Sequence, residues 1–326
     1  MPLEQHHASD RIHRYGSPDV LELKEVAKPI PGDDEVLVKV LAASLNDWDW
    51  EALRGTFLNR PIFGFLRPHK QILGSDIAGR IEAVGKGVIR FKPGDEVLGD
   101  LSGRWGGFAE YVCARENALV LKPAGMTFEQ AAAIPQAALL ALQGLHDAGR
   151  IQKGQKVLIN GAGGGVGTFA IQLARLYDAD VTAVDSAEKL DMLRSMGALH
   201  VIDYKREDFT RNGERYDLVL DVKASRSVSD CTRALSRNGV YVVLGGSIAR
   251  LLPALLLSPW NSRVRKKHIR VLMLKANVGL EHITELFEAG RIVPVIDGPY
   301  ELSEVPEAFR HFGSGRHKGK VVITLA

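Results

Sequence analysis

The sequence predicts a two-part α/β protein in which a small antiparallel barrel or sandwich precedes a doubly wound parallel sheet. Short β-branched segments separated by glycine and proline fill the first third, to about residue 123. From about residue 156 onward, apolar strands alternate with helices, which is typical of parallel sheets. The length of 326 residues accommodates about two domains of ordinary size.

Three segments of the first third carry a strand pattern: 35–41, 76–84 and 94–98. They are rich in β-branched residues or alternate apolar with polar side chains, as strands do. Glycine and proline stand between them, where turns are required. An Ala- and Leu-rich helix is expected over 127–141, with an interruption at Pro135 because proline lacks the amide hydrogen of a continuous helix.

The second part alternates strands with helices, and the short connections between them favour a parallel sheet. Ser186 is a candidate N-cap for one of the helices. In chain order we expect strand 156–161, helix 165–177, strand 181–184, helix 186–196, strands 200–204 and 216–222, helix 228–236, strand 240–245, strand 270–275, helix 282–289 and a final strand from 319.

Composition excludes several classes of protein. The 42 Lys and Arg residues against 39 Asp and Glu give a net charge of +3, too small to indicate a nucleic-acid partner. Two cysteines cannot build a disulfide framework or a four-thiolate zinc site. The apolar stretch 248–257 is far shorter than the roughly 20 residues of a membrane span. We therefore expect a cytoplasmic protein with no secretory signal, no membrane span and no nucleic-acid partner.

A basic run, RVRKKHIR over 263–270, follows that apolar stretch. It is interpreted as a surface helix and loop with a solvated basic face. Contact with a membrane surface or with nucleic acid is the alternative, although no aromatic residues interleave the cations as nucleic-acid binding would favour.

The strongest chemical signal is the glycine-rich stretch NGAGGGVGTFAIQLA, residues 160–174. An expected strand enters it, a helix leaves it and Asp185 closes the next strand, which is the context of a dinucleotide-binding fingerprint. Gly164 would let the backbone approach a pyrophosphate, and Gly167 would let the helix pack on the strand. The helix N-terminus would offer N–H groups to the phosphates. Ala162 departs from the usual first glycine, and a turn with no ligand is the alternative.

The residues leave the phosphate state of the dinucleotide open. Asp185 favours NAD(H), because a carboxylate bonds ribose hydroxyls and repels a 2′-phosphate. Lys189 and Tyr204 could instead hold that phosphate, although Lys189 could equally be a solvated helix residue. We expect NADP(H) rather than NAD(H), with these contributors to the site: Gly164, Gly165, Val166, Gly167, Asp185, Ser186, Lys189 and Tyr204.

With the glycine loop, four further segments resemble the medium-chain dehydrogenase/reductases, in their zinc-free quinone-oxidoreductase, zeta-crystallin-like branch. These segments are 42–55, 73–99, 106–112 and the closing GKVVI, and they follow the order of the family over nearly the whole chain. The resemblance implies a GroES-like β-barrel catalytic domain over 1–123 and 292–326. It also implies a Rossmann domain over 124–291, inserted into the barrel domain, with nicotinamide and substrate held in the cleft between the two.

The family also implies where the nicotinamide ring would lie. Gly245 and Gly246 match a loop that passes the ring, and Lys320 matches a segment near it. Zinc-dependent relatives place Cys at the position of Asn46 and Gly-His-Glu at 74–76, where this chain has Gly-Ser-Asp. Because neither thiolate nor imidazole is present, we expect no zinc.

Without a metal, the simplest chemistry is hydride transfer to a carbon that is already electrophilic. The resemblance implies NAD(P)H-dependent reduction of a quinone or of the activated C=C bond of an α,β-unsaturated carbonyl. Asn46 is the candidate donor to the carbonyl oxygen. Trp48 and Trp50 are candidate walls for a planar acceptor and share one side if their segment is extended, with core packing as the alternative. The nearby acids are expected to be structural: Asp47, Asp49 and Asp76.

Two other functions remain open. A nucleotide-binding redox sensor or RNA-binding protein with little turnover would fit the basic run 263–270. It would also fit Glu51 and Leu140, which stand where many family members have Tyr and Thr. An enoyl-thioester reductase would use the same hydride chemistry. The family commonly dimerises through the edge strand of the Rossmann sheet, which we place at 270–275, so we expect a homodimer.

Overall fold

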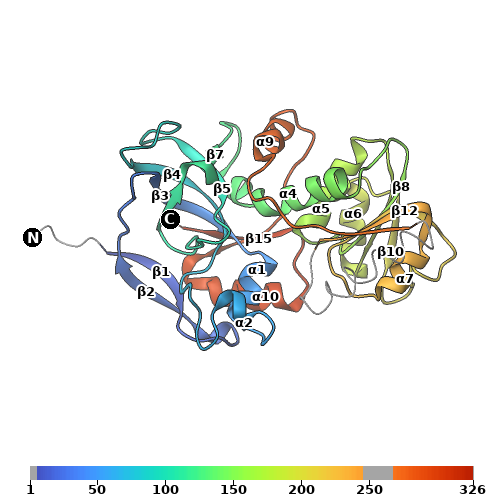
Figure 1. The fold of residues 1–326 in the computed structure, drawn as a ribbon, viewed down its shortest axis with the longest axis horizontal. Coiled ribbons are helices and arrows are strands. Elements are labelled where there is room, and N and C mark those ends of the chain that lie inside the picture. The colour runs from blue at the N-terminus through green and yellow to red at the C-terminus, as the bar shows by residue number, and fades with distance from the viewer. Residues whose placement is uncertain (1–5, 245–266, 326) are drawn as a thin grey trace, which may run out of the picture. The chain divides into compact units, whose positions relative to one another are not determined.

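The computed structural model describes residues 6–244 and 267–325 (Figure 1). The chain divides into two compact units, here called the barrel unit (Met1–Gln136, Ala276–Gly290 and Pro294–Ala326) and the Rossmann unit (Ala137–Lys275 and Arg291–Val293). The predicted fold class, a barrel with an inserted parallel-sheet domain, is confirmed. Compared with the expected bounds, residues 124–136 and 276–290 group with the barrel, and residues 292–293 group with the Rossmann unit.

The barrel unit is built on a seven-stranded sheet in the order β14-β15-β3-β4-β5-β7, with β6 paired to β3. A separate hairpin joins β1 (His6–Ile12) to β2 (Leu21–Ala27). Figure 1 shows the red C-terminal strand β15 beside the blue β3, so the two ends of the chain complete one sheet. The sheet strands are β3 (Glu35–Ser44), β4 (Asp76–Val84), β5 (Glu96–Asp100), β6 (Tyr111–Arg115), β7 (Val120–Leu121), β14 (Ile296–Glu301) and β15 (Lys320–Thr324).

The register of this sheet brings distant segments to the end of β3. Ser44, near that end, pairs with Asp76 at the start of β4 on one side and with Val322 of β15 on the other. Both neighbours run antiparallel to β3, so Lys320 and Asp76 flank the residues that follow Ser44. The polar site described below is a consequence of this register.

The helices and short turns of the barrel unit complete its core. The large side chains that are fully buried there include Leu45, Leu53, Ile77, Phe108 and Phe309. The helices are α1 (Asp47–Arg54), α2 (Arg60–Phe63), α3 (Phe128–Ala132), α9 (Leu280–Glu288) and α10 (Val305–Ser314), with 3₁₀ turns at Pro18–Val20, Glu116–Ala118 and Leu302–Glu304.

The Rossmann unit holds a six-stranded parallel sheet in the order β10-β9-β8-β11-β12-β13. Counted within this unit, the order is 3-2-1-4-5-6, the arrangement of dinucleotide-binding domains. Its elements are α4 (Pro135–Gln143, whose first two residues group with the barrel), the π-helical turn Gly144–Ala148, β8 (Lys156–Asn160), α5 (Gly165–Arg175), β9 (Asp180–Asp185), the 3₁₀ turn Ala187–Lys189, α6 (Leu190–Ser195), β10 (His200–Asp203), β11 (Tyr216–Asp221), α7 (Val228–Arg233), β12 (Leu235–Val243) and β13 (His268–Val271).

The structure corrects several local expectations. Ser186 makes no side-chain cap, and the helix after it begins as a 3₁₀ turn. The basic run is not a solvated helix throughout, because residues 268–270 belong to edge strand β13 and residues 263–266 lie outside the described residues. Lys267 donates to the Thr232 carbonyl at 2.6 Å and Arg270 donates to the Ala148 carbonyl. These two cations are therefore engaged by backbone carbonyls, whereas Arg263, Arg265 and Lys266 lie outside the described residues. Among the described helices, none is long and apolar enough to cross a membrane.

Candidate active site

The glycine loop of the Rossmann unit connects β8 to α5. Gly161 leaves the strand with a φ of 83°, a conformation that L side chains rarely adopt. Gly164 stands in the N-cap position, and α5 begins at Gly165. A Cβ atom on Gly167 would lie 2.4 Å from the Ala162 Cα atom, so only glycine lets the helix pack this closely on the loop. Free N–H groups of the first helical turn can therefore receive a phosphate.

Asp185 ends β9 directly behind this loop, and its side chain shapes the loop. The buried carboxylate accepts hydrogen bonds from the backbone N–H groups of Gly163 and Ser186, both at 2.8 Å. The Lys189 ammonium lies 3.5 Å from the same carboxylate. Lys189 is only 3% exposed, so the interpretation of this lysine as a solvated helix residue is wrong. The charge of Asp185 is thus offset within the protein, and its oxygens are engaged by the backbone of the loop.

Three exposed side chains follow the neighbouring strand β10. Tyr204 donates its backbone N–H to the Asp185 carbonyl at 3.1 Å and leaves its side chain 50% exposed. The Lys205 ammonium lies 5.9 Å from the Tyr204 ring centroid, and Arg206 is exposed. Sequence reasoning missed Lys205 and Arg206, although two cations directly after Tyr204 were the available signal. Gly245 and Gly246, expected beside the nicotinamide, lie outside the described residues.

In the barrel unit, the register of β15, β3 and β4 builds a buried polar cluster around Asn46. The Lys320 ammonium donates to the Asn46 Oδ1 atom at 2.6 Å, the Leu45 carbonyl at 2.9 Å and the Asp76 carboxylate at 3.3 Å. An ammonium has three N–H donors, and each has an acceptor here. The Asn46 Nδ2 atom donates to Ser75 Oγ at 3.0 Å. We call Lys320, Asn46, Ser75 and Asp76 the Lys320 network.

Burial dominates the electrostatics of this network. It raises the pKa of Asp76, while the Lys320 ammonium and hydrogen bonds from Asn46 and Gln136 act against that rise. Asp49 accepts the backbone N–H groups of Asn46 at 2.9 Å and Gly74 at 3.0 Å, and burial raises its pKa to about 7. Asp49 and Asp76 therefore hold backbone and side chains in place, as predicted for structural acids.

A third buried carboxyl, Asp100, lies beyond Asp76 in the barrel. Burial, with the charge of Asp76 adding to the effect, raises the pKa of Asp100 to about 6. The Ser102 backbone N–H donates to this carboxyl at 2.7 Å. The Gln136 backbone N–H donates to Asp76, and its side-chain amide donates to Ser102 Oγ at 3.2 Å. Hydrogen bonds thus connect the Lys320 network to Ser102, which lines the pocket described next.

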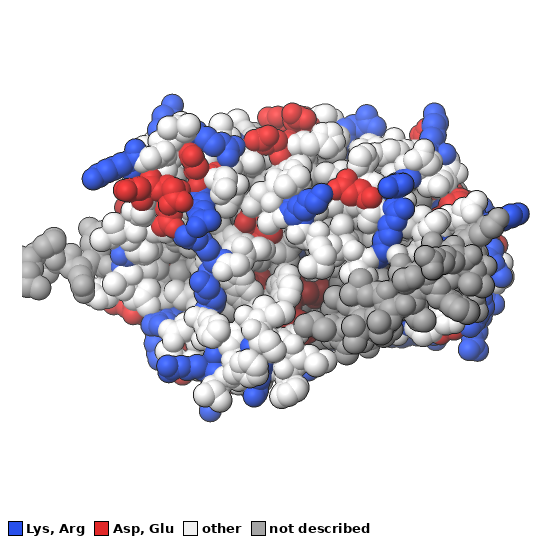
Figure 2. Space-filling model, in the orientation of Figure 1, with Lys and Arg blue, Asp and Glu red and all other residues white. Residues whose placement is uncertain are grey.

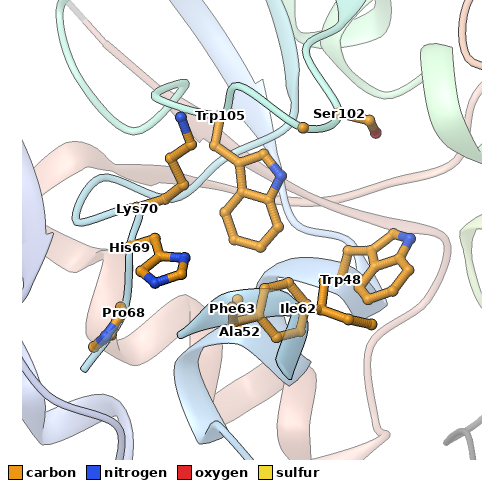
Figure 3. Close-up of a pocket in the computed structure, with 10 residues that line it drawn as sticks. Trp48, Ala52, Ile62, Phe63, Pro68, His69, Lys70, Ser102 and Trp105 are labelled. Atoms are coloured by element: carbon orange, nitrogen blue, oxygen red, sulfur yellow. The ribbon is translucent and has the colours of Figure 1, made fainter. Parts of the chain in front are cut away.

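An apolar pocket of about 430 Å³ opens in the same unit (Figure 3). Three aromatic rings line it: the centroid of Phe63 lies 5.3 Å from that of Trp48 and 5.5 Å from that of Trp105. The other lining residues are Ala52, Ile62, Pro68, His69, Lys70, Ser102 and Gly103. Sequence reasoning found only Trp48 among these residues; the aromatic-rich stretch after α1 was the available signal for the rest.

The two tryptophans of α1 do not share a side. The prediction that they do assumed an extended segment, but residues 47–54 are helical and residues two apart on a helix point in different directions. Trp48 is 44% exposed and lines the pocket. Trp50 packs into the core, with its ring centroid 6.4 Å from Phe309 and 6.3 Å from Phe312. For Trp50, the core-packing alternative describes the structure.

The residues at the place of the family's catalytic zinc do not fit that metal. Asn46 and Ser75 offer an amide and a hydroxyl, where tetrahedral zinc sites use Cys, His and carboxylate ligands. The Lys320 ammonium lies against both Asn46 and Asp76, and its charge would repel a metal ion there. Across residues 6–244 and 267–325, no group of three or more His, Cys, Asp or Glu side chains could hold a metal.

Comparison with known proteins places the chain in a family. Two family models match, the alcohol dehydrogenase GroES-like domain over residues 32–124 and the zinc-binding dehydrogenase over residues 196–323. The chain is 36% identical over 321 residues to the 2-methylene-furan-3-one reductase of Solanum lycopersicum, covering 95% of this chain and 76% of that protein. It is 33% identical over 321 residues to the chloroplastic NADPH-dependent alkenal/one oxidoreductase of Arabidopsis thaliana, covering 95% and 77%.

Two further relatives support the same placement. The quinone oxidoreductase of Homo sapiens is 30% identical over 333 residues, covering 97% of each chain. The structure of the quinone oxidoreductase from Coxiella burnetii superposes with a TM-score of 0.88 at 28% identity, covering 99% of this chain and all of that one. These matches confirm the predicted family: the chain belongs to the medium-chain dehydrogenase/reductase superfamily, in its quinone-oxidoreductase branch.

Proposed function

We propose that this protein reduces quinones or the activated C=C bond of α,β-unsaturated carbonyls with hydride from NADPH. It is an NAD(P)H-dependent oxidoreductase of the same branch as relatives named for quinone, alkenal and furanone reduction. The observation that carries the choice of acceptor is the aromatic pocket of the barrel unit, whose neighbouring donor set does not fit zinc. An acceptor that is already electrophilic needs no Lewis acid.

The bound cofactor supplies the hydride, and the protein supplies orientation and electrostatics. Trp48, Phe63 and Trp105 offer aromatic surfaces on which a planar acceptor can stack. His69 and Lys70 also line this pocket and can donate to a carbonyl oxygen. Asn46 remains our candidate for stabilising the developing charge, held in place by Lys320 and Ser75.

The preference for NADPH is supported by the surroundings of Asp185. A carboxylate at this position would repel a 2′-phosphate, but here Lys189 offsets its charge and the loop backbone engages its oxygens. Tyr204, Lys205 and Arg206 are available next to it to receive a dianionic phosphate. The cytoplasmic compartment and the homodimer remain expectations from the sequence.

The test is a screen of NADPH and NADH oxidation with quinones, alkenals, enones and a crotonyl thioester. We expect turnover with a quinone or an enone and a higher kcat/KM with NADPH than with NADH. Tight NADPH binding without turnover of any acceptor would contradict the proposal. Turnover confined to the thioester would replace the proposed acceptor with an acyl thioester.

A further inference from the structure

The segment from Arg54 to Lys70, which runs from the end of α1 through α2, exposes most of its large apolar side chains. Leu66 is 94% exposed, Phe57 80% and Phe65 65%, while Leu58 and Ile62 are each about half exposed. Clusters of exposed apolar side chains mark interaction sites more often than they mark ordinary surface. We call residues 54–70 the apolar loop.

The charged residues of the apolar loop are all basic. Arg54, Arg67 and Lys70 are exposed and Arg60 is half-buried, whereas no Asp or Glu occurs between Glu51 and Asp76. Within the part of the chain that the structure describes, Arg54, Arg67 and Lys70 have no ion-pair partner. Figure 2 shows white surface flanked by blue over the edge where α2 lies in Figure 1.

We propose that the apolar loop docks on the surface of an anionic lipid bilayer. Side chains such as Phe and Leu insert at the boundary between headgroups and acyl chains, while Lys and Arg attract anionic headgroups. The three most exposed apolar side chains, Phe57, Phe65 and Leu66, are not among the residues that line the pocket. A bilayer accepts such projecting side chains without a preformed complementary groove, so lipid suits this surface better than an acidic protein does.

Docking would also supply the pocket with substrate. Ile62, Phe63, Pro68, His69 and Lys70 belong to the apolar loop and line the pocket as well. A lipid-soluble acceptor could therefore pass from the bilayer into the pocket without crossing water. This consequence rests on the proposed function, whereas docking itself does not and is measured without any turnover.

The test is sedimentation with vesicles of phosphatidylcholine alone and of phosphatidylcholine with phosphatidylglycerol. We expect binding to the anionic vesicles that weakens with salt, and little binding to the neutral ones. The triple variant Phe57→Ser, Phe65→Ser, Leu66→Ser should lower the partition coefficient at least tenfold. The matched control replaces equally exposed apolar residues elsewhere, Ile30→Ser, Ile89→Ser and Leu199→Ser, and should bind like the parent chain.

A second set of variants tests the charges. Arg54→Gln, Arg67→Gln and Lys70→Gln should each lower binding to anionic vesicles about fivefold, because a surface cation contributes about 1 kcal/mol. The control exchanges Lys86, Arg237 and Arg291, which are also exposed, for Gln. Thermal unfolding confirms that each variant is folded.

Two results would overturn the proposal, and a third measurement would reassign the surface. The first is no sedimentation of the parent chain with either vesicle, and the second is undiminished binding of the triple Ser variant. If the parent chain does not bind vesicles and the triple Ser variant changes its oligomeric state on gel filtration, the apolar loop is assigned to contact between protein chains.

Discussion

Each unit of the molecule buries one lysine against one aspartate, and the two pairs are built differently. In the Rossmann unit, Lys189 and Asp185 are four residues apart and lie 3.5 Å from each other, and the aspartate side chain is 10% exposed. In the barrel unit, Lys320 and Asp76 are 244 residues apart, lie 3.3 Å from each other and are almost fully enclosed. The first pair follows from a local motif, whereas the second exists only because β15, β3 and β4 share one sheet.

The comparison predicts that breaking the barrel pair has the largest effect on stability. Asp76→Ala would leave the Lys320 ammonium buried and unpaired, and we expect it to lower the free energy of unfolding by about 3–5 kcal/mol. Asp185→Ala should cost less, about 1–3 kcal/mol, because the Asp185 side chain is 10% exposed whereas that of Asp76 is fully enclosed. Urea denaturation measures both variants.

Two controls define this prediction. The double variant Lys320→Met, Asp76→Leu should recover most of the loss, since no buried charge is then uncompensated. Lys153→Ala breaks an exposed pair with Asp178 and should change the unfolding free energy by less than about 1 kcal/mol. If Asp76→Ala proves as mild as Lys153→Ala, the Lys320 network is not the buried structure described here.

Asn46→Ala tests whether the barrel pair also serves catalysis. We expect kcat to fall by about 10² to 10³, the loss typical of removing one preorganised donor, while the dissociation constant for NADPH stays within threefold. Asn46→Asp keeps the size of the side chain but adds a carboxylate beside Asp76, and should be equally slow. Equal losses in turnover and NADPH binding would count against a role toward the substrate oxygen.

Asp49, which is buried close to the barrel pair, predicts a pH dependence of stability. The pKa of Asp49 is about 7 in the folded protein, against about 3.9 for an exposed aspartate. Its folded state holds the proton more tightly, so this contribution to stability is complete below pH 3.9 and is lost as the pH rises through 7. The free energy of unfolding should therefore fall with rising pH, and Asp49→Asn should reduce this slope by up to about 1.4 kcal/mol per pH unit. Urea titrations between pH 4.5 and 7.5 measure the slope. An unchanged slope would contradict the protonated state of Asp49.

Removing the lysine of the Rossmann pair should have the smallest effect on turnover, and it tests the role of this lysine toward the cofactor. Lys189→Met leaves the charge of Asp185 beside the expected position of the 2′-phosphate. We therefore expect the KM for NADPH to rise about tenfold and the KM for NADH to change by less than threefold. A parallel rise in both KM values would mean that Lys189 supports the loop rather than the phosphate.

The features that could be predicted from the sequence are those determined by residues close together in the chain. The strands, the glycine loop and the acid that ends β9 are recognisable because turn glycines and apolar periodicity act over a few residues. The contact between Lys320 and Asp76 could not be predicted, because only the pairing of β15 with β3 creates it. Prediction also failed locally at Trp48 and Trp50, because the short segment that follows β3 is compatible with either an extended or a helical backbone.

The pocket illustrates the same limit on a larger scale. Phe63 and Trp105 are more than 40 residues apart, and their approach depends on how the chain packs rather than on any spacing. The functional class was still predictable, because it rests on several family motifs that occur in a fixed order. An error in interpreting one motif does not affect the others.

The enclosed lysine constrains the routes by which such a chain could evolve. Asn46→Cys and Ser75→His would supply two ligands of a zinc enzyme, but the ammonium would still lie against the site. Replacing Lys320 first would strand the charge of Asp76 in the core and threaten the fold. Intermediates on this path are therefore either unstable or unable to bind the metal, so the Lys320–Asp76 pair separates this chain from a zinc-dependent variant by more than the two ligand substitutions.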